Sequence, residues 1–118
     1  MRLALAICGY CLLSGAAHAE PDANKFLRDY DAATAAEKRL MSEGLSRVEL
    51  GMSWVNVFLT ENRNERSVYC PPNTLALSGD QLVDVLRKEV KGTPEEASRP
   101  YGLVLLLALQ KAYPCQSK

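Results

Sequence analysis

Histidine is nearly absent from this sequence: His18 is the single one among 118 residues, and it lies in a segment that we expect to be removed. Histidine is the commonest general base and metal ligand in proteins, so the remaining chain lacks the usual means of activating a serine. Gly44, Gly51 and Gly92 are isolated, which excludes a glycine-rich phosphate loop. We therefore expect no enzymatic activity, no metal and no cofactor.

An excess of charge of either sign is also missing. The sequence has 14 basic and 14 acidic side chains, and loss of Arg2 with the N-terminal segment would leave 13 basic ones. Without a basic patch or a long run of one sign, neither nucleic acid nor a membrane surface is indicated as a partner. Sustained period-two alternation is absent as well, so no β-sheet is predicted.

The first 19 residues have the features of a signal peptide. Met1-Arg2 is a short basic start, Leu3 to Leu13 is an apolar core, and Ala17-His18-Ala19 supplies small residues where a signal peptidase cleaves. The core is too short to span a bilayer comfortably, which argues against a retained anchor. We predict a signal peptide over residues 1–19 and one exported domain over residues 20–118.

Cleavage would leave two cysteines, Cys70 and Cys115, an even number in an exported chain. Each adjoins a proline, in mirror order, and prolines stop helices, so both cysteines should lie where regular structure begins or ends. A disulfide between them closes a loop of roughly 46 residues, which stabilises the fold by about 4 kcal/mol. A reactive or metal-binding pair is the weaker alternative, because the spacing fits neither a redox motif nor a zinc site.

The pattern after residue 19 predicts an all-α fold, a compact bundle of about four helices with one disulfide. Caps at Asp22, Thr34 and Ser78 open the first three helices, and Thr34 and Ser78 begin capping boxes. We expect one helix from Ala23 to about Tyr30 and a second from the Thr34 box to about Asn62. A third should begin at the Ser78 box and be stopped by Gly92, and the last should run from near Pro100 to Ala112. The run from Leu103 to Leu109 has no polar face, so we expect it to lie centrally and to be covered on several sides.

The second predicted helix carries two apolar rows. One is an a/d seam, expected in the core of the bundle: Met41, Leu45, Val48, Met52, Val55 and Leu59. The other is a flanking row: Leu40, Gly44, Arg47, Gly51, Trp54 and Phe58. Gly44 and Gly51 let another backbone approach closely, which indicates either a kink or packing notch within the chain or the contact of a homodimer.

Four segments, in order, resemble the Rap/Tai helical immunity family. They are Phe26-Leu27-x-x-Tyr30, Tyr69-Cys70-x-Pro72, Gln81-Leu82-Val83-x-Val85-Leu86 and Ala108-Leu109-x-x-Ala112-Tyr113-Pro114-Cys115. The resemblance implies a periplasmic, all-helical and often dimeric protein that accompanies type VI secretion and blocks a delivered peptidoglycan amidase by occupying its substrate cleft. Many relatives carry a second cysteine pair in the first two helices, which this chain lacks after Ala19.

The polar connection from Lys91 to Arg99 joins two strongly apolar helices. Gly92 and Pro94 make it a stiff protrusion, which lowers the cost of ordering it in a partner's cleft. The resemblance implies that such a loop enters the amidase active site, with Glu95, Glu96 and Arg99 as contact residues. The alternatives are a solvated connector at this place and a contact surface at the Glu61–Arg66 turn.

Two classes of function remain open from the sequence. The first is an immunity-type inhibitor with a protein partner, the amidase. The second is a small periplasmic chaperone or stress protein that opens at low pH, and a stabilising subunit of an envelope complex is a third possibility.

Overall fold

The protein is described by a computed structural model over residues 19–72 and 77–116. Within these residues the chain forms four α-helices: α1 (Ala23–Ala32), α2 (Ala35–Asn62), α3 (Gly79–Gly92) and α4 (Tyr101–Ala112). A short 3-10 helix, η1 (Pro94–Ser98), joins α3 to α4, and no strand forms in this part of the chain. The prediction of an all-α fold with about four helices is confirmed. Apart from Ala19, the predicted signal peptide lies outside the described residues.

The first three helices begin at the predicted caps. The side chain of Asp22 accepts a hydrogen bond from a backbone amide in the first turn of α1. Thr34 with Glu37, and Ser78 with Gln81, form the two predicted capping boxes at the starts of α2 and α3. Such a cap stabilises a helix by about 1 kcal/mol. These local signals account for why the observed helix starts agree with the predicted ones.

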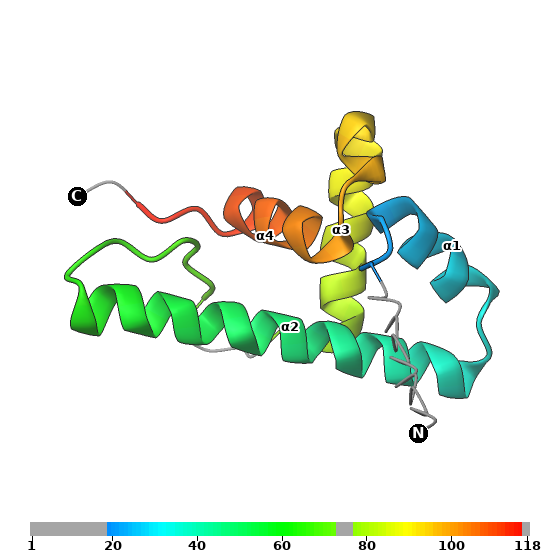
Figure 1. The fold of residues 1–118 in the computed structure, drawn as a ribbon, viewed down its shortest axis with the longest axis horizontal. Helices are drawn as coiled ribbons and strands as arrows, with labels where there is room; N and C mark the ends of the chain where they lie inside the picture. The colour runs from blue at the N-terminus through cyan, green and yellow to red at the C-terminus, as the bar shows by residue number, and fades with distance from the viewer. Residues whose placement is uncertain (1–18, 73–76, 117–118) are drawn as a thin grey trace, which may run out of the picture.

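Helix α3 is the element around which the others pack. It contacts α1, α2 and α4, and in Figure 1 it stands across the long α2 with α1 and α4 on opposite sides. Its buried side chains Leu82, Val83 and Leu86 lie at helical spacing. From the other helices, the following buried side chains complete the core: Ala23, Phe26, Leu27, Leu45, Val104, Leu105 and Leu109. Backbone hydrogen bonds also join the start of α1 to the start of α4, because the amide of Ala23 donates to Arg99 O at 2.9 Å.

The apolar run of α4 is only partly covered. Val104, Leu105, Ala108 and Leu109 are buried, as expected for a central helix. Leu103 is exposed, so the expected cover on several sides does not extend to this position. The reason is that α3 and the other elements pack against one side of α4 rather than around it.

A short segment that we call the strap, Ser67–Cys70, lies against α2 and the end of α4. The predicted disulfide between Cys70 and Cys115 is present, with the two Cα atoms 4.9 Å apart. The amide of Cys70 also donates to Tyr113 O at 2.8 Å. The bond therefore links the strap covalently to the chain that follows α4, and the predicted disulfide pairing is confirmed.

A polar clamp holds the strap on α2. The buried Asn56 accepts a hydrogen bond from the amide of Val68 at 2.7 Å and donates one to Tyr69 O at 2.9 Å. The buried Tyr69 hydroxyl donates to Glu49 Oε1 at 2.7 Å. Burial, and then the bond to Glu49, raise the pKa of Tyr69 far above its ordinary value, so the hydroxyl stays protonated and remains a donor.

The a/d seam of α2 lies in the core for only part of its length. Leu45 is buried, and Met41, Val48 and Met52 pack against the core. Val55, further along the same seam, is 49% exposed. The expectation that the seam as a whole is core was wrong at Val55, because α3 crosses α2 and the strap then covers a different side of the helix.

Candidate partner-binding surfaces

Histidine, cysteine and carboxylate side chains are the groups that could hold a metal or support acid–base catalysis. Among residues 19–72 and 77–116, no three histidine, cysteine or carboxylate side chains come together as metal ligands. No helix in these ranges is long and apolar enough to cross a membrane. The features that stand out are instead surfaces: the end of the molecule around η1, a hollow beside it, and one long face of α2.

Helix η1 forms a folded turn at the end of α3 that points away from α2 (Figure 1). The amide of Glu96 donates to Thr93 O at 2.9 Å, and the amide of Arg99 donates to Glu96 O at 3.0 Å. The carbonyl of Arg99 is tied in turn to α1. The Lys91–Arg99 connection is therefore ordered by its own hydrogen bonds, which limits the entropy that binding would remove.

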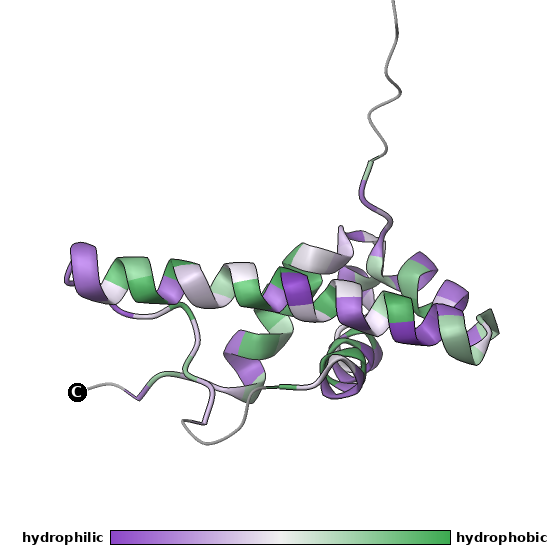
Figure 2. Ribbon diagram, turned by 90° about the horizontal axis from the view of Figure 1, so that it is seen from below, coloured by the Kyte–Doolittle hydropathy of each residue, from purple (hydrophilic) through white to green (hydrophobic). Residues whose placement is uncertain are grey.

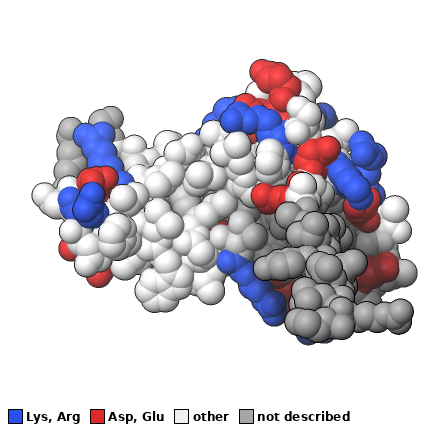
Figure 3. Space-filling model, viewed as in Figure 1, with Lys and Arg blue, Asp and Glu red and all other residues white. Residues whose placement is uncertain are grey.

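The three predicted contact residues of this turn do not act alike. Arg99 Nη1 lies 2.7 Å from Glu96 Oε2 and 3.0 Å from Oε1, so these two side chains form an ion pair that closes the turn. The structure thus brings Glu96 and Arg99 together, whereas Glu95 is exposed on η1. Acidic atoms mark this tip of the molecule in Figure 3. Of the three, Glu95 is the side chain best placed to meet a partner.

A hollow of about 500 Å³ lies between α3 and α4, beside the η1 turn. Its lining is mostly apolar or aliphatic: Val85, Lys88, Glu89, Gly92, Thr93, Ala108, Lys111, Ala112 and Tyr113. The Glu89 side chain is 7% exposed, and Lys111 Nζ lies 2.6 Å from its Oε1 and 2.9 Å from Thr93 Oγ1. A buried carboxylate is stable here because Lys111, itself 63% exposed, neutralises it.

Sequence reasoning did not identify Glu89 as a site residue, although a signal was present. Glu89 falls three residues after Leu86, so it lies on the inward face of α3 among apolar side chains. A charged residue at an inward position needs a partner, and Lys111 in the last turn of α4 provides it. The spacing predicts the burial of Glu89, but only the fold identifies the partner.

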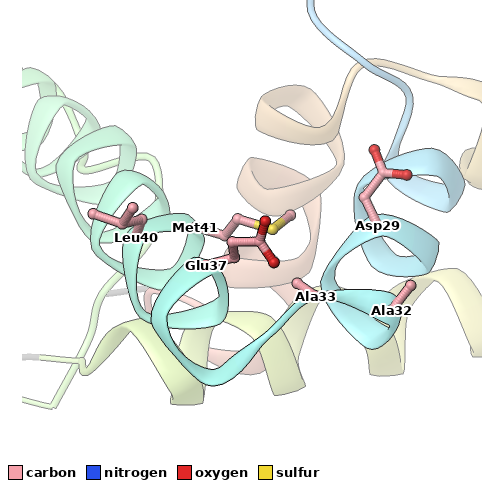
Figure 4. Close-up of a pocket in the computed structure, with 6 residues that line it drawn as sticks. All are labelled: Asp29, Ala32, Ala33, Glu37, Leu40 and Met41. Carbon is pink, nitrogen blue, oxygen red and sulfur yellow. The ribbon is translucent and has the colours of Figure 1, made fainter.

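A second hollow, of about 480 Å³, lies at the turn between α1 and α2 (Figure 4). Its carboxylates already have local roles, because Asp29 pairs with Lys25 and Glu37 belongs to the capping box of α2. The bonds from Thr34 lower the pKa of Glu37, its backbone amide contributing most. Because these carboxylates already have partners within the turn between α1 and α2, we do not assign this hollow as a partner-binding site.

The outward face of α2 leaves large apolar side chains uncovered by the rest of the described chain. We use this name for the flanking row Leu40, Gly44, Arg47, Gly51, Trp54 and Phe58, all of which are exposed. Leu40, Trp54 and Phe58 are 68%, 66% and 53% exposed. Six of the seven large apolar side chains exposed in the described residues are on α2, so exposure is concentrated on one helix. Apolar segments recur along α2 in Figure 2, and Figure 3 shows a broad uncharged surface between charged ends.

The two glycines of this face are not required by the packing of the described chain. A Cβ atom built on Gly44 or Gly51 meets nothing within 4 Å. A Cβ atom on Gly79 would instead lie 2.4 Å from the backbone oxygen of Ser42, where α3 begins against α2. Gly79 is therefore required by a close approach of two helices, and the interpretation of Gly44 and Gly51 as a packing notch for another part of the described chain was wrong.

Together, these features define a small helical domain held by one disulfide, with apolar side chains exposed along α2. The sequence profile of the family described as Rap1a immunity proteins matches residues 4–115, and the chain belongs to this family. The resemblance inferred from the four sequence segments is thereby confirmed. No curated protein and no solved structure is significantly similar to the chain. Family membership identifies an immunity protein that binds a secreted effector protein.

Proposed function

We propose that the chain acts in the periplasm, where it neutralises a peptidoglycan amidase delivered by type VI secretion by covering the active site of the enzyme. It does so by binding, not by catalysis. The signal-peptide pattern of residues 1–19 supports export, and the Cys70–Cys115 disulfide suits an oxidising compartment. Family membership supports the immunity role, and the preceding resemblance suggests the amidase as its target.

The observation that carries the choice of contact surface is the ordered η1 turn. It protrudes at the end of α3, its backbone is fixed by hydrogen bonds to Thr93, Glu96 and Ala23, and it presents Glu95 to solvent. A turn that is ordered before binding loses little entropy when it enters a cleft. The adjoining hollow with Glu89 and Lys111 extends the same end of the molecule, so a partner that receives η1 would also meet this hollow.

A two-step experiment tests this function. Protein purified from the periplasm, with its disulfide intact, is used to capture the effector from extracts of secreting cells, and the captured protein is identified by mass spectrometry. The purified effector is then assayed for release of peptides from peptidoglycan with increasing amounts of the immunity protein. We expect activity to fall to zero near equal molar amounts. A captured amidase that remains fully active at saturation would contradict active-site occlusion.

The contact surface is tested with single charge reversals. Glu95→Arg should weaken effector binding at least tenfold, about 1.4 kcal/mol, while leaving the melting temperature unchanged, because Glu95 is exposed. Glu61→Arg, at the other end of the molecule, is the matched control and also probes the Glu61–Arg66 turn. A loss of affinity in the control alone would move the contact to that turn. Glu96 and Arg99 are left intact because their ion pair closes the η1 turn.

The exposed apolar face of α2 favours a second candidate function, a periplasmic chaperone that binds unfolded proteins. Such a chaperone would slow the aggregation of reduced insulin at sub-stoichiometric amounts, more strongly at pH 3 than at pH 7. An immunity protein without this activity would leave the aggregation rate unchanged at both pH values. Light scattering of the insulin sample therefore separates the two functions without any knowledge of the effector.

A further inference from the structure

The hollow between α3 and α4 contains a polar atom that the described chain leaves without a partner. The Glu89 side chain is 7% exposed, and its Oε1 accepts a hydrogen bond from Lys111. Its other oxygen, Oε2, accepts none from the described residues. Because no fully buried side-chain oxygen or nitrogen among these residues lacks a hydrogen bond, Oε2 must be reached by solvent. A nearly buried carboxylate therefore presents one free acceptor to the hollow that it lines.

We propose that this hollow binds the C-terminal end of a peptide chain. Glu89 Oε2 accepts a hydrogen bond from the N–H of the last peptide residue, and the ammonium groups of Lys88 and Lys111 bind the terminal carboxylate. The hollow, of about 500 Å³, is within the size range of small-ligand sites, about 300–1,000 Å³. The inference goes beyond the immunity role, because it concerns the hollow alone and requires no effector.

The shape of the hollow suits a peptide with small side chains. Its α3 wall is one helix face, with residues at i, i+3, i+4 and i+7: Val85, Lys88, Glu89 and Gly92. Ala108 and Ala112 line it from α4, so the apolar parts of both walls are short. A Cβ atom built on Gly92 meets nothing within 4 Å, which leaves room for the backbone of a ligand to approach α3 closely.

The floor of the hollow favours a neutral N–H donor. Helices α3 and α4 both end there, at Gly92 and Ala112, and the last carbonyl groups of a helix attract donors as Glu89 Oε2 does. An ammonium group is a poorer occupant than an amide. Lys111 already neutralises Glu89, so a further cation would lie beside Lys111 without an opposite charge of its own.

The lysines of the hollow favour a carboxylate next to that donor. Lys88 is exposed and forms no ion pair with the described residues. An ammonium group has three donors, and Lys111 uses two of them, on Glu89 and Thr93. The lining residues include two lysines and one glutamate, so one anionic group balances their charge. The last residue of a peptide carries its N–H and its carboxylate on the same Cα atom, whereas an inorganic anion or a fatty acid would leave Oε2 without a donor.

Peptide analogues test the two halves of the site. The exported, disulfide-bonded chain, labelled with nitrogen-15, is titrated with acetyl-tri-alanine and followed by nuclear magnetic resonance. We expect saturable shifts of the amides around the hollow, with a dissociation constant of about 0.1–1 mM for a ligand of this size. The C-terminal amide of the peptide should bind at least tenfold more weakly. An analogue that ends in lactate, with an ester oxygen in place of the last N–H, should lose a similar factor because that oxygen faces Glu89.

The other outcomes of the titration would overturn the proposal. Equal affinities for the acid and the amide would exclude the carboxylate contact, and equal affinities for the acid and the lactate analogue would exclude the contact with Glu89. Binding of tri-alanine only when its N-terminus is not acetylated would show that the hollow takes the other end of a peptide. An absence of saturable shifts around the hollow up to about 20 mM peptide would exclude the site. None of these outcomes bears on capture of the effector.

Variants of the chain give an independent test, with circular dichroism to show that each is folded. Lys88→Met keeps the aliphatic stem and should weaken binding of the acid peptide at least fivefold, with no change for the amide. Lys91→Met makes the same change on α3 outside the hollow and should follow the parent. Glu89→Gln supplies an amide that can donate to an ester, so it should reduce the discrimination against the lactate analogue. Equal losses in the two lysine variants, or unchanged discrimination in Glu89→Gln, would overturn the proposed contacts.

Discussion

The inward and outward faces of α2 carry apolar side chains at the same helical spacing, yet their surroundings differ. On the inward side, Leu45 is buried against the core, and Asn56 is bonded to the strap that covers it. On the outward side, Trp54 and Phe58 are more than half exposed. The difference shows that a regular helical spacing of apolar residues is not sufficient to form a core. A helix face is covered only where another element packs against it, and an uncovered apolar face is available to another molecule.

The largest effect on the inward side is expected from loss of the disulfide. Cys115→Ser releases the strap from the chain after α4, because Cys70 then has no covalent partner. We expect the free energy of unfolding to fall by about 2–5 kcal/mol, since the loop closed by the bond is long. Urea denaturation followed by circular dichroism measures the change, and the parent in reductant should reproduce it. A loss of less than 1 kcal/mol in the free energy of unfolding would show that the hydrogen bonds of Asn56 hold the strap in place without the disulfide.

The clamp is broken directly by Asn56→Leu. This change removes the acceptor for Val68 N and the donor for Tyr69 O, which leaves two polar backbone groups near the core without their bonds. We expect a loss of about 2–3 kcal/mol in the free energy of unfolding. Asn62→Leu, the same chemical change at the exposed end of α2, is the matched control and should stay within about 0.5 kcal/mol of the parent. Equal losses in both variants would contradict the clamp.

The comparison also shows which parts of the fold follow from sequence. The helix starts were predictable because capping boxes at Thr34 and Ser78 involve residues three apart, and the disulfide was predictable because prolines adjoin both cysteines. The choice between the two faces of α2 was not predictable, since both rows have helical spacing and contacts from α3 and the strap decide which is covered. Asn56, a polar residue in an apolar stretch, was a signal of a buried hydrogen bond but not of its partner.

Two glycine substitutions should change the free energy of unfolding in opposite directions, one where α3 begins against α2 and one on the outward face of α2. Gly79→Ala places a Cβ atom 2.4 Å from the backbone oxygen of Ser42, so α3 must shift from α2, and we expect a loss of about 1–3 kcal/mol. Gly51→Ala meets open space on the outward face and improves helix propensity, so the monomer should gain up to about 1 kcal/mol. Thermal unfolding at low protein concentration measures both. A destabilising Gly51→Ala would show that this glycine is required within the chain.

The smallest expected effect is a pH dependence at the ion pair that joins α1 to α3, away from both faces of α2. Arg87 donates to both oxygens of Asp31, at 2.6 Å and 2.9 Å, and this hydrogen bonding is the main cause that lowers the pKa of Asp31. Because the folded-state pKa lies below the unfolded one, about 3.9 for aspartate, the pair stabilises the fold above that value. The contribution is lost as pH falls through the lower, folded-state pKa.

The test is the slope of unfolding free energy against pH between pH 5 and pH 2. Asp31→Asn removes the titrating group but keeps the side-chain shape, so we expect the slope of the variant to be shallower than that of the parent at the acidic end. Both residues of the pair are partly exposed to solvent, which keeps the difference small. Asp29→Asn, on the same helix but paired only with Lys25, is the control and should follow the parent. Parallel curves for the parent and Asp31→Asn would show that the Arg87 contact does not persist in solution.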